Sequence, residues 1–193
     1  MNSRSYTSPL RARAAEATRE RILEAALARI SVDYYDDVTL DAIAADAGVT
    51  VQTVIRRFGS KEGVVRAITE ARTPGVTTQR DAAPAGDVPG AIANLVEHYE
   101  AIGDLVMLLL RQEERVPPFA EVTTYGKAYH VRWIERVFAR WLDRVADTER
   151  QILHAQLLAV CDTYMWYLLR RQRGLSREQT ERALIALVDG ILR

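Results

Sequence analysis

The chain has 193 residues, of which 48% are hydrophobic and 27% are charged, so it is predicted to be globular rather than disordered. Basic and acidic residues both total 26, and the single cysteine, Cys161, excludes an intrachain disulfide, so neither count names a partner. The longest apolar run, 105–110, is too short to span a bilayer, and the polar N-terminal stretch does not resemble a secretory signal, so we expect a cytoplasmic protein without a membrane partner.

The N-terminal third reads as four helices. Alanine, leucine, arginine and glutamate are abundant, and strand-like alternation is hard to find, which predicts an all-α fold. A first helix is expected over about 16–32, followed by an acidic turn at 33–37. Thr39 offers an N-cap for a second helix, Gly48 suits its end, and Thr50 and Ser60 offer N-caps for a third and a fourth.

The stretch 73–90 changes character. It contains Pro74, Pro84, Pro89 and three glycines, a composition that breaks helices. We interpret it as a linker between an N-terminal domain, 1–72, and a C-terminal domain, 91–193. Helical patterns return at about 90–103, 104–115, 119–145 and 148–173. Ser176, with Gln179 three residues on, is a capping-box pattern that opens the last helix.

Residues 39–57 have the helix-turn-helix pattern, in which two short helices meet at one glycine. The second helix is lightly apolar and leaves Gln52, Thr53, Arg56 and Arg57 for solvent or a partner. Glutamine can bond adenine, threonine can contact a thymine methyl, and arginine suits guanine or phosphate, as a recognition helix requires. Two short helices joined by glycine also occur in helical proteins with no DNA role, so spacing alone leaves both readings open.

Two segments carry a family resemblance: TRERILEAALARIS from Thr18, and VTLDAIAADAGVTVQTVIRRFGSKEGVVRAI, which ends at Ile68. Across these fifty or so residues the chain resembles the N-terminal domain of the tetracycline-repressor (TetR) family of bacterial transcriptional regulators. The resemblance implies a three-helix DNA-binding head and a connecting fourth helix. It also implies a C-terminal helical domain that dimerises and binds a small-molecule effector.

The same resemblance implies roles for individual residues. Thr39 and Thr50 would meet phosphate at helix N-termini. Lys61 would contact phosphate, and Val51, Gln52 and Thr53 would face the bases of operator DNA. Two positions depart from the family pattern, because Ile55 stands where an aromatic residue is usual and Arg57 stands where Tyr or His is usual. Arg57 could replace the phosphate contact that a tyrosine would make.

The N-terminal arm is a second candidate for DNA contact. Arg4, Arg11 and Arg13 lie in it, and arms of other helix-turn-helix proteins reach phosphates or the minor groove. The alternative is that Met1–Ser8 is a tail without structure.

A homodimer is expected because one head reads only a few base pairs, and two heads on successive turns of the groove are the usual solution. Helix 148–173 and the last helix carry more apolar residues than one core stripe needs, which indicates one face for the core and one for a second copy. The alternative is that both helices are buried within one chain. The candidate interface residues are Leu153, Leu157, Val160, Met165, Leu184, Leu187, Val188 and Ile191.

A ligand pocket is expected in the middle helices, where aromatic rings and polar groups gather as they do around drug-sized molecules. Any one of these residues can equally be ordinary core or surface, and Glu113 or Glu114 could simply pair with Arg111. The candidate ligand residues are His98, Tyr99, Met107, Arg111, Tyr129, Trp133 and Tyr164. No cofactor is predicted.

Two other classes of protein, an enzyme and a protein-interaction module, are alternatives. An enzyme is disfavoured because His98, His130 and His154 fall on separate predicted helices without metal-ligand spacing, and Cys161 sits in an apolar run. We therefore predict no catalytic and no metal residues. A helical interaction module with a degenerate head is the other alternative, since Ile55 departs from the family pattern. The preferred hypothesis is a sequence-specific, ligand-released repressor that acts as a homodimer.

Overall fold

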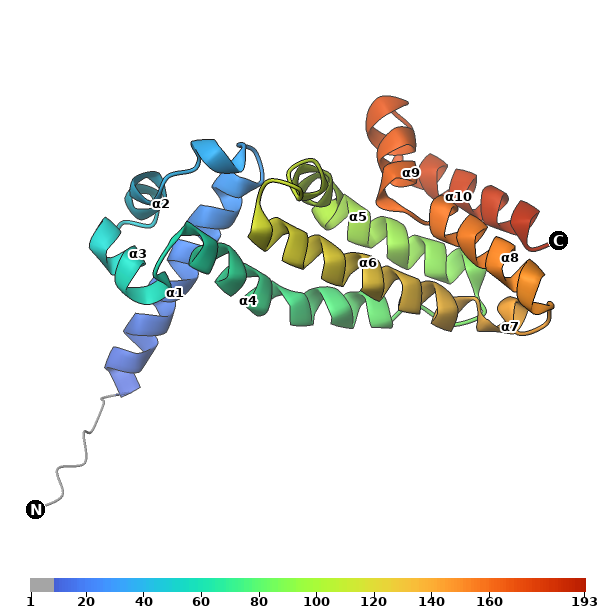
Figure 1. The fold of residues 1–193 in the computed structure, drawn as a ribbon, viewed down its shortest axis with the longest axis horizontal. Coiled ribbons are helices and arrows are strands. Elements are labelled where there is room, and N and C mark those ends of the chain that lie inside the picture. Colours follow the sequence, from blue (N-terminus) through green and yellow to red (C-terminus); the bar gives the residue numbers. More distant parts are fainter. Residues whose placement is uncertain (1–8) are drawn as a thin grey trace, which may run out of the picture. The chain divides into compact units, whose positions relative to one another are not determined.

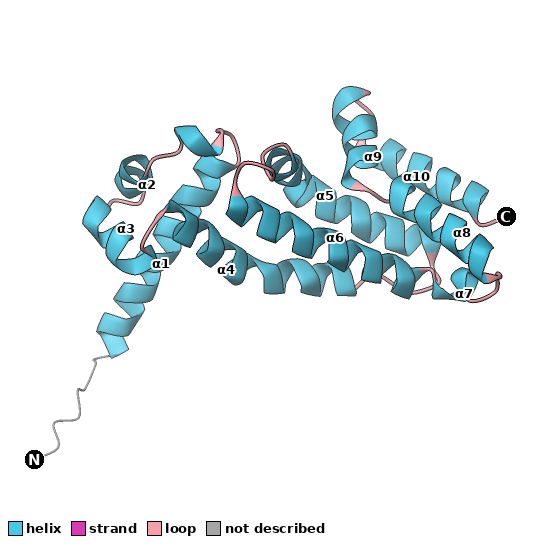
Figure 2. Cartoon of the chain, viewed as in Figure 1, coloured by secondary structure: helices cyan, strands magenta, loops and turns pink. Residues whose placement is uncertain are grey.

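The computed structural model describes residues 9–193 as helices and connecting turns, with no strand in that range (Figures 1 and 2). The all-α prediction is therefore confirmed. The chain divides after Ala71 into two compact units, and helix α4 (Lys61–Asp81) supplies residues to both. No helix within the described range is long and apolar enough to cross a membrane.

Unit 1 contains α1 (Pro9–Ile30), the 3₁₀ turn η1 (Tyr35–Asp37), α2 (Leu40–Asp46), α3 (Val51–Phe58) and the first turns of α4. Its order of elements is as predicted, but α1 begins before residue 16. Arg11 and Arg13 are therefore exposed residues of α1, whereas Arg4 and the rest of Met1–Ser8 lie outside the described residues. The core of unit 1 includes Ile22, Leu23, Ala26, Ile30, Ile43, Ala44, Val54 and Val64.

Unit 2 is a helical bundle organised around α5 (Val88–Leu110), which packs against α6 (Pro117–Val137), α9 (Thr163–Tyr167) and α10 (Arg177–Ile191). The short α7 (Ala139–Leu142), α8 (Asp147–Val160) and the π turn η2 (Leu168–Gln172) complete it. Its largest fully buried side chains include Trp133, Trp166, Phe138, Leu95 and Leu157.

The predicted break at 73–90 is wrong for its first half, because α4 continues through Pro74 to Asp81. Only 82–87 is non-helical, with Gly86 at φ 78°. Packing explains the difference. The Gln79 side chain donates to the Asn94 carbonyl and the Asn94 side chain donates back to the Gln79 carbonyl, which anchors the last turns of α4 on α5. Tertiary contacts thus override the local effect of the proline.

Three further boundaries differ from the predictions. The patterns at 90–103 and 104–115 merge into one helix, α5, which passes through Gly103, packed against the Trp166 indole, and ends at Leu110. The predicted helix 119–145 ends at Val137. The predicted helix 148–173 breaks at Cys161, where the Asp162 side chain accepts a hydrogen bond from the Tyr164 amide and starts α9.

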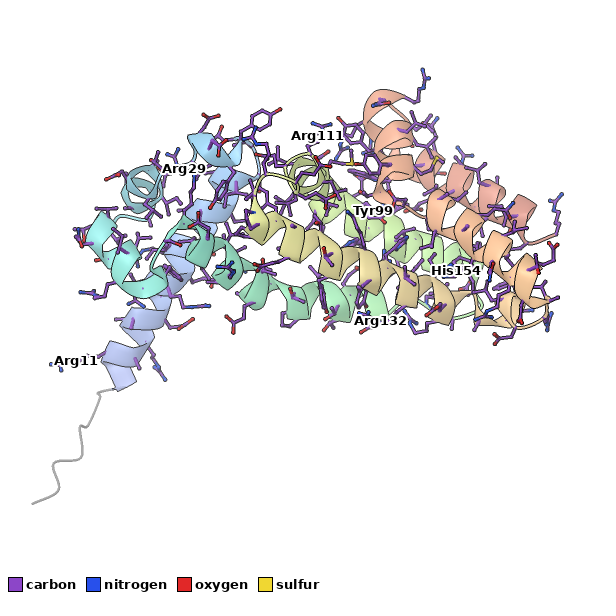
Figure 3. The ribbon with its side chains drawn as sticks, in the orientation of Figure 1. Arg11, Arg29, Tyr99, Arg111, Arg132 and His154 are labelled. Carbon is purple, nitrogen blue, oxygen red and sulfur yellow. The ribbon has the colours of Figure 1, made fainter. Side chains whose placement is uncertain are left out.

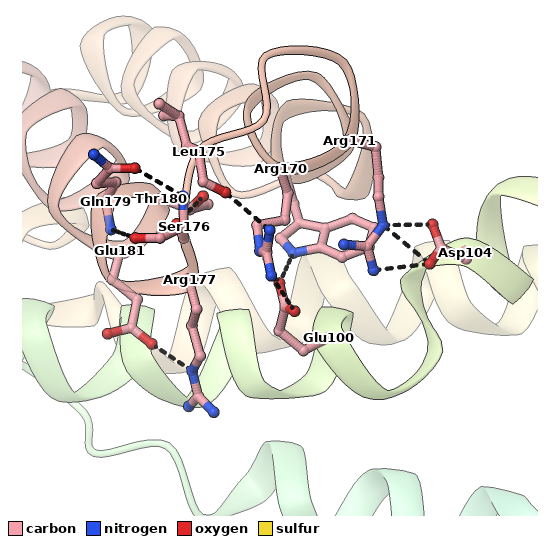
Figure 4. Close-up of polar contacts among 11 residues, drawn as sticks. Glu100, Asp104, Arg170, Arg171, Leu175, Ser176, Arg177, Gln179, Thr180 and Glu181 are labelled. Carbon is pink, nitrogen blue, oxygen red and sulfur yellow. Dashed lines mark hydrogen bonds and ion pairs between the residues drawn. The ribbon is translucent and has the colours of Figure 1, made fainter.

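Charged pairs fasten the segment after this break to α5 (Figure 4). The Glu100 carboxylate accepts from Trp166 Nε1 at 3.0 Å and from Arg170 Nε at 2.7 Å, and Asp104 pairs with Arg171 at 2.8 Å. The chain then turns into α10, whose predicted capping box between Ser176 and Gln179 is confirmed.

Replacing Gly103 by alanine should destabilise the protein. A Cβ there would lie 2.4 Å from Cζ3 of Trp166, so the buried indole must move, at a cost of about 1–3 kcal/mol. Gly126→Ala is the matched control, because a Cβ there meets nothing within 4 Å and a helical alanine gains up to about 1 kcal/mol over glycine. Urea unfolding measures both changes, and similar effects of the two substitutions would contradict this account of Gly103.

Candidate nucleic-acid interface and buried polar cluster

The turn between α2 and α3 is fixed by local hydrogen bonds. Gly48 has φ 64°, and the Val49 amide returns to the Ala44 carbonyl at 3.0 Å. The Thr39 hydroxyl accepts from the Ala42 amide at 3.1 Å, and the Thr50 hydroxyl accepts from the Thr53 amide at 3.3 Å. Both threonines that the resemblance assigns to phosphate therefore act as N-caps, with their side chains exposed.

Helix α3 buries one side chain completely and exposes most of the rest. Val54 is fully buried, while Gln52, Arg56 and Arg57 are exposed. Ile55 is 39% exposed, which leaves an apolar side chain on this outward face. Val51 and Thr53 are half-buried. The exposed Gln52 amide can both donate to and accept from a base edge. The two exposed guanidinium groups can donate to base edges or to phosphates.

Two arginines of α1 hold this helix pair in place. Arg21 Nε donates to the Ala47 carbonyl at 3.2 Å, at the end of α2. Arg29, labelled in Figure 3, makes a two-pronged ion pair with Asp46, with one contact at 3.0 Å. The Arg29 guanidinium lowers the pKa of Asp46, so the pair stays charged at neutral pH. These contacts fix α2, the partner helix of α3, against α1.

Lys61 does not lie as the resemblance implies. Its Nζ donates to the backbone carbonyls of Tyr35 at 2.6 Å and Val38 at 2.8 Å, and it sits 3.9 Å from the centre of the Tyr35 ring. The 3₁₀ turn at η1 turns these carbonyls toward the ammonium group. This geometry uses Lys61 to tie the start of α4 to η1 and does not support the expected phosphate contact by its side chain.

Within unit 2, Arg80 of α4 is buried with only 2% of its surface exposed. Its Nη2 lies 3.2 Å from Nδ1 of His130, and its guanidinium carbon lies 4.2 Å from the centre of the Trp133 ring, both on α6. Trp133 Nε1 also donates to the Arg80 carbonyl at 3.2 Å. From α5, Tyr99 interacts with the same guanidinium and donates its hydroxyl to the Cys161 carbonyl at 2.9 Å.

The groups around Arg80 are held uncharged. Burial, followed by the Arg80 charge, lowers the pKa of His98 and of His130 to about 3. Burial raises the pKa of the Cys161 thiol to about 12 and also raises that of Tyr99. Burial lowers the pKa of Arg80 itself, but a guanidinium stays protonated in proteins. At neutral pH the cluster is therefore one cation among neutral side chains.

The predicted ligand residues do not all meet. His98, Tyr99, Tyr129 and Trp133 interact with Arg80. Met107 is buried farther along α5. Arg111 is exposed and donates to the Tyr167 hydroxyl at 3.1 Å, rather than pairing with a glutamate. Tyr164 is 56% exposed on α9.

Sequence reasoning missed Arg80 itself, which fell inside the assigned linker, and missed His130 as a member of the cluster. A signal was present: Val76, Arg80 and Ala83 follow i, i+4, i+7 spacing, which would place Arg80 on an inward helix face.

Three of the predicted interface residues are wrong. Leu157, Leu184 and Val188 are fully buried inside unit 2, because α8 and α10 turn these positions toward α5 and α6. Leu187 is 44% exposed. The other four predicted residues, Leu153, Val160, Met165 and Ile191, are half-buried against the same core.

Comparisons with known proteins agree with this architecture. The family model described as bacterial regulatory proteins, tetR family, matches residues 22–68. No curated protein matches the chain. A solved transcriptional regulator from Rhodococcus sp. Rha1 superposes with a TM-score of 0.70 at 18% identity, over 90% of this chain and 95% of that one.

Two further solved structures have the same fold. The SmeT–triclosan complex superposes with a TM-score of 0.67 at 21% identity, over 91% of this chain and 90% of that one. NalD, the secondary repressor of the MexAB-OprM multidrug efflux pump in Pseudomonas aeruginosa, gives a TM-score of 0.66 at 18% identity, over 91% and 96%.

The α2–α3 pair lies inside the segment that matches this family model. Residues 22–68 of the chain thus match the tetR family of bacterial regulatory proteins, and the chain as a whole shares its all-α fold with solved transcriptional regulators.

Lys61→Met should destabilise unit 1, because the Tyr35 and Val38 carbonyls lose a charged donor while the apolar stem is kept. We expect a loss of about 1–3 kcal/mol in thermal or urea unfolding. Arg56→Met, which removes an exposed cation of α3, should leave stability near that of the wild type. Unchanged stability of Lys61→Met, together with a smaller salt dependence of DNA binding, would instead restore the phosphate role.

Proposed function

We propose that the protein is a homodimeric transcriptional repressor that binds operator DNA through α3 and releases it when a small-molecule effector binds unit 2. The observation that carries this proposal is the outward face of α3, with Gln52, Arg56 and Arg57, inside a unit that matches the family model. The proposed function includes no catalytic role.

Base and phosphate contacts divide along α3. Gln52, in the first turn, is suited to reach an adenine edge, since the N-terminal residues of a recognition helix enter the major groove. Arg56 and Arg57, in the last turn, supply charge for phosphates or guanine. Ile55 offers no hydrogen bond from its exposed position, so Arg57 is the nearest candidate for the phosphate contact that an aromatic hydroxyl would make.

A second copy is proposed to pack on the outer faces of α8 and α10. These helices pack against each other, and each shows exposed small or apolar residues at helical spacing. Small and apolar residues on such a face let two helix pairs approach closely in a four-helix arrangement. The exposed residues are Ile152, Ala155 and Ala159 on α8, and Ala186, Leu187 and Gly190 on α10.

Helix α4 is the proposed link between effector and operator. Residues 61–71 of this helix belong to unit 1 and residues 72–81 to unit 2. A ligand that shifts α4 in unit 2 would therefore change the separation of the two DNA-binding heads in a dimer. The coupling free energy needed is modest, typically about 1–3 kcal/mol. The structurally similar SmeT was solved in complex with triclosan and the structurally similar NalD is a repressor, and both facts support such a regulator.

The first test is fluorescence anisotropy with DNA from upstream of the protein's own gene and a scrambled duplex, at two salt concentrations. We expect selective binding that weakens steeply with salt. Gln52→Ala should change the preferred sequence, at a cost of about 1–3 kcal/mol on the cognate site. Arg57→Gln should weaken binding to every duplex and lower the salt slope by about one.

If Gln52→Ala and Arg57→Gln changed the sequence preference and the salt slope in the same way, the division of roles along α3 would be contradicted. Equal, weak binding of the wild type to all upstream fragments of the genome would favour the alternative, an interaction module whose head no longer reads DNA because of Ile55.

The dimer is tested by Leu187→Lys and Gly190→Arg, which place charge on the outer face of α10. Light scattering should give twice 21.7 kDa for the wild type and a single chain for both variants, with weaker operator binding. Val32→Lys makes a similar change at an exposed position of unit 1 and should remain dimeric. A wild-type mass of one chain would end the dimer proposal.

A further inference from the structure

Arg80 is a buried cation that forms no ion pair with a carboxylate in the part of the chain from residue 9 to residue 193. Among residues 9–193, its Nη1 is a buried donor without a hydrogen-bond partner. Its other contacts are with neutral groups: the His130 imidazole at 3.2 Å and the Trp133 ring at 4.2 Å. A buried guanidinium is expected to be paired with an anion as well as hydrogen-bonded.

Neighbouring carboxylates are engaged elsewhere. Asp81, next in sequence, accepts a hydrogen bond from the Tyr129 hydroxyl, and Glu100 on α5 is paired with Arg170. The groups that act electrostatically on Arg80 are Tyr99, Tyr129 and Cys161, which are all neutral near pH 7. A second cation lies close by, since the Arg136 guanidinium donates to the Arg80 carbonyl at 3.2 Å.

The surroundings specify the kind of anion that would fit. The groups that contact the guanidinium from α5 and α6 are the aromatic rings of Tyr99 and Trp133 and the imidazole of His130, so the partner needs an apolar body. One guanidinium balances one negative charge, and its planar fork matches the two oxygens of a carboxylate. A dianionic phosphate would need more donors than this cluster supplies.

We propose that unit 2 binds an apolar carboxylic acid as the effector and that Arg80 is the residue that pairs with its carboxylate. The proposal rests on the function proposed above, because it takes unit 2 to be the effector domain. The Nη1 and Nη2 groups of Arg80 hold the two oxygens, and the His130 imidazole, 3.2 Å from Nη2, flanks the ion pair. Because Arg80 lies on α4, the ion pair forms directly on the helix that also belongs to unit 1.

The experiment uses the full chain without DNA and measures thermal unfolding by differential scanning calorimetry. The probes are straight-chain acids from hexanoate to hexadecanoate, benzoate and 2-naphthoate, each beside its neutral amide at equal concentration. At least one acid should raise Tm by several degrees, by mass action on the folded state, and its amide should raise it far less.

Variants then assign the acid effect to Arg80. Arg80→Met should remove the difference between acid and amide, and Arg80→Lys, which keeps the charge but loses the planar fork, should retain part of it. Arg132→Met removes an exposed cation of α6, labelled in Figure 3, and should keep the whole difference. The proposal is overturned if no acid raises Tm, if amides match acids, or if a folded Arg80→Met responds as the wild type does.

Operator binding separates this inference from the proposed function. Acid binding that needs Arg80 supports the inference whether or not DNA is released, whereas an acid that binds without weakening operator affinity removes only the effector-release part of the proposed function. Selective DNA binding without a Tm response to any acid would support the proposed regulator and overturn the proposed carboxylate site.

Discussion

The continuity of α4 is the constraint on which the rest of the structure depends. Its first turns bury Val64, Val65 and Ile68 in unit 1, and its last turn buries Arg80 in unit 2. Pro74 lies between these two sets and removes a backbone donor, a change that costs about 3 kcal/mol or more in a helix interior. The helix persists because both of its ends are fixed by packing, and it contributes residues to each of the two units.

The outward face of α3 is exposed because other elements supply its support. Val54 alone is fully buried, and hydrogen bonds from Arg21 and Lys61 fix the ends of the neighbouring elements. A helix that needed more apolar residues for its own packing would have fewer positions left for a partner. Two cations that look like free surface charges in the sequence thus become structural supports, whereas Arg56 and Arg57 in the last turn of α3 remain exposed.

The sequence predicts features whose cause is local. Gly48, the cap at Thr50 and the capping box at Ser176 specify their turns within a few residues, so α2, α3 and α10 are found nearly at their true bounds. Features with a distant cause are missed. The Trp166 ring explains Gly103, and α5 explains why α4 passes Pro74. Apolar spacing likewise could not separate core residues such as Leu157 from interface residues, because both have the same period.

The buried cluster was the hardest part to predict, for a physical reason. A charged residue in a stretch rich in proline and glycine is normally solvated, and only the packed unit shows that Arg80 is not. Keeping a lone guanidinium inside an apolar bundle lowers stability unless a counter-charge arrives, and an apolar residue of similar volume would pack there at less cost. Sites of this kind, where local stability is given up, are where function is expected. The imidazole and indole that flank Arg80 reduce the cost of its burial without removing the charge, which leaves a cation ready for an anion.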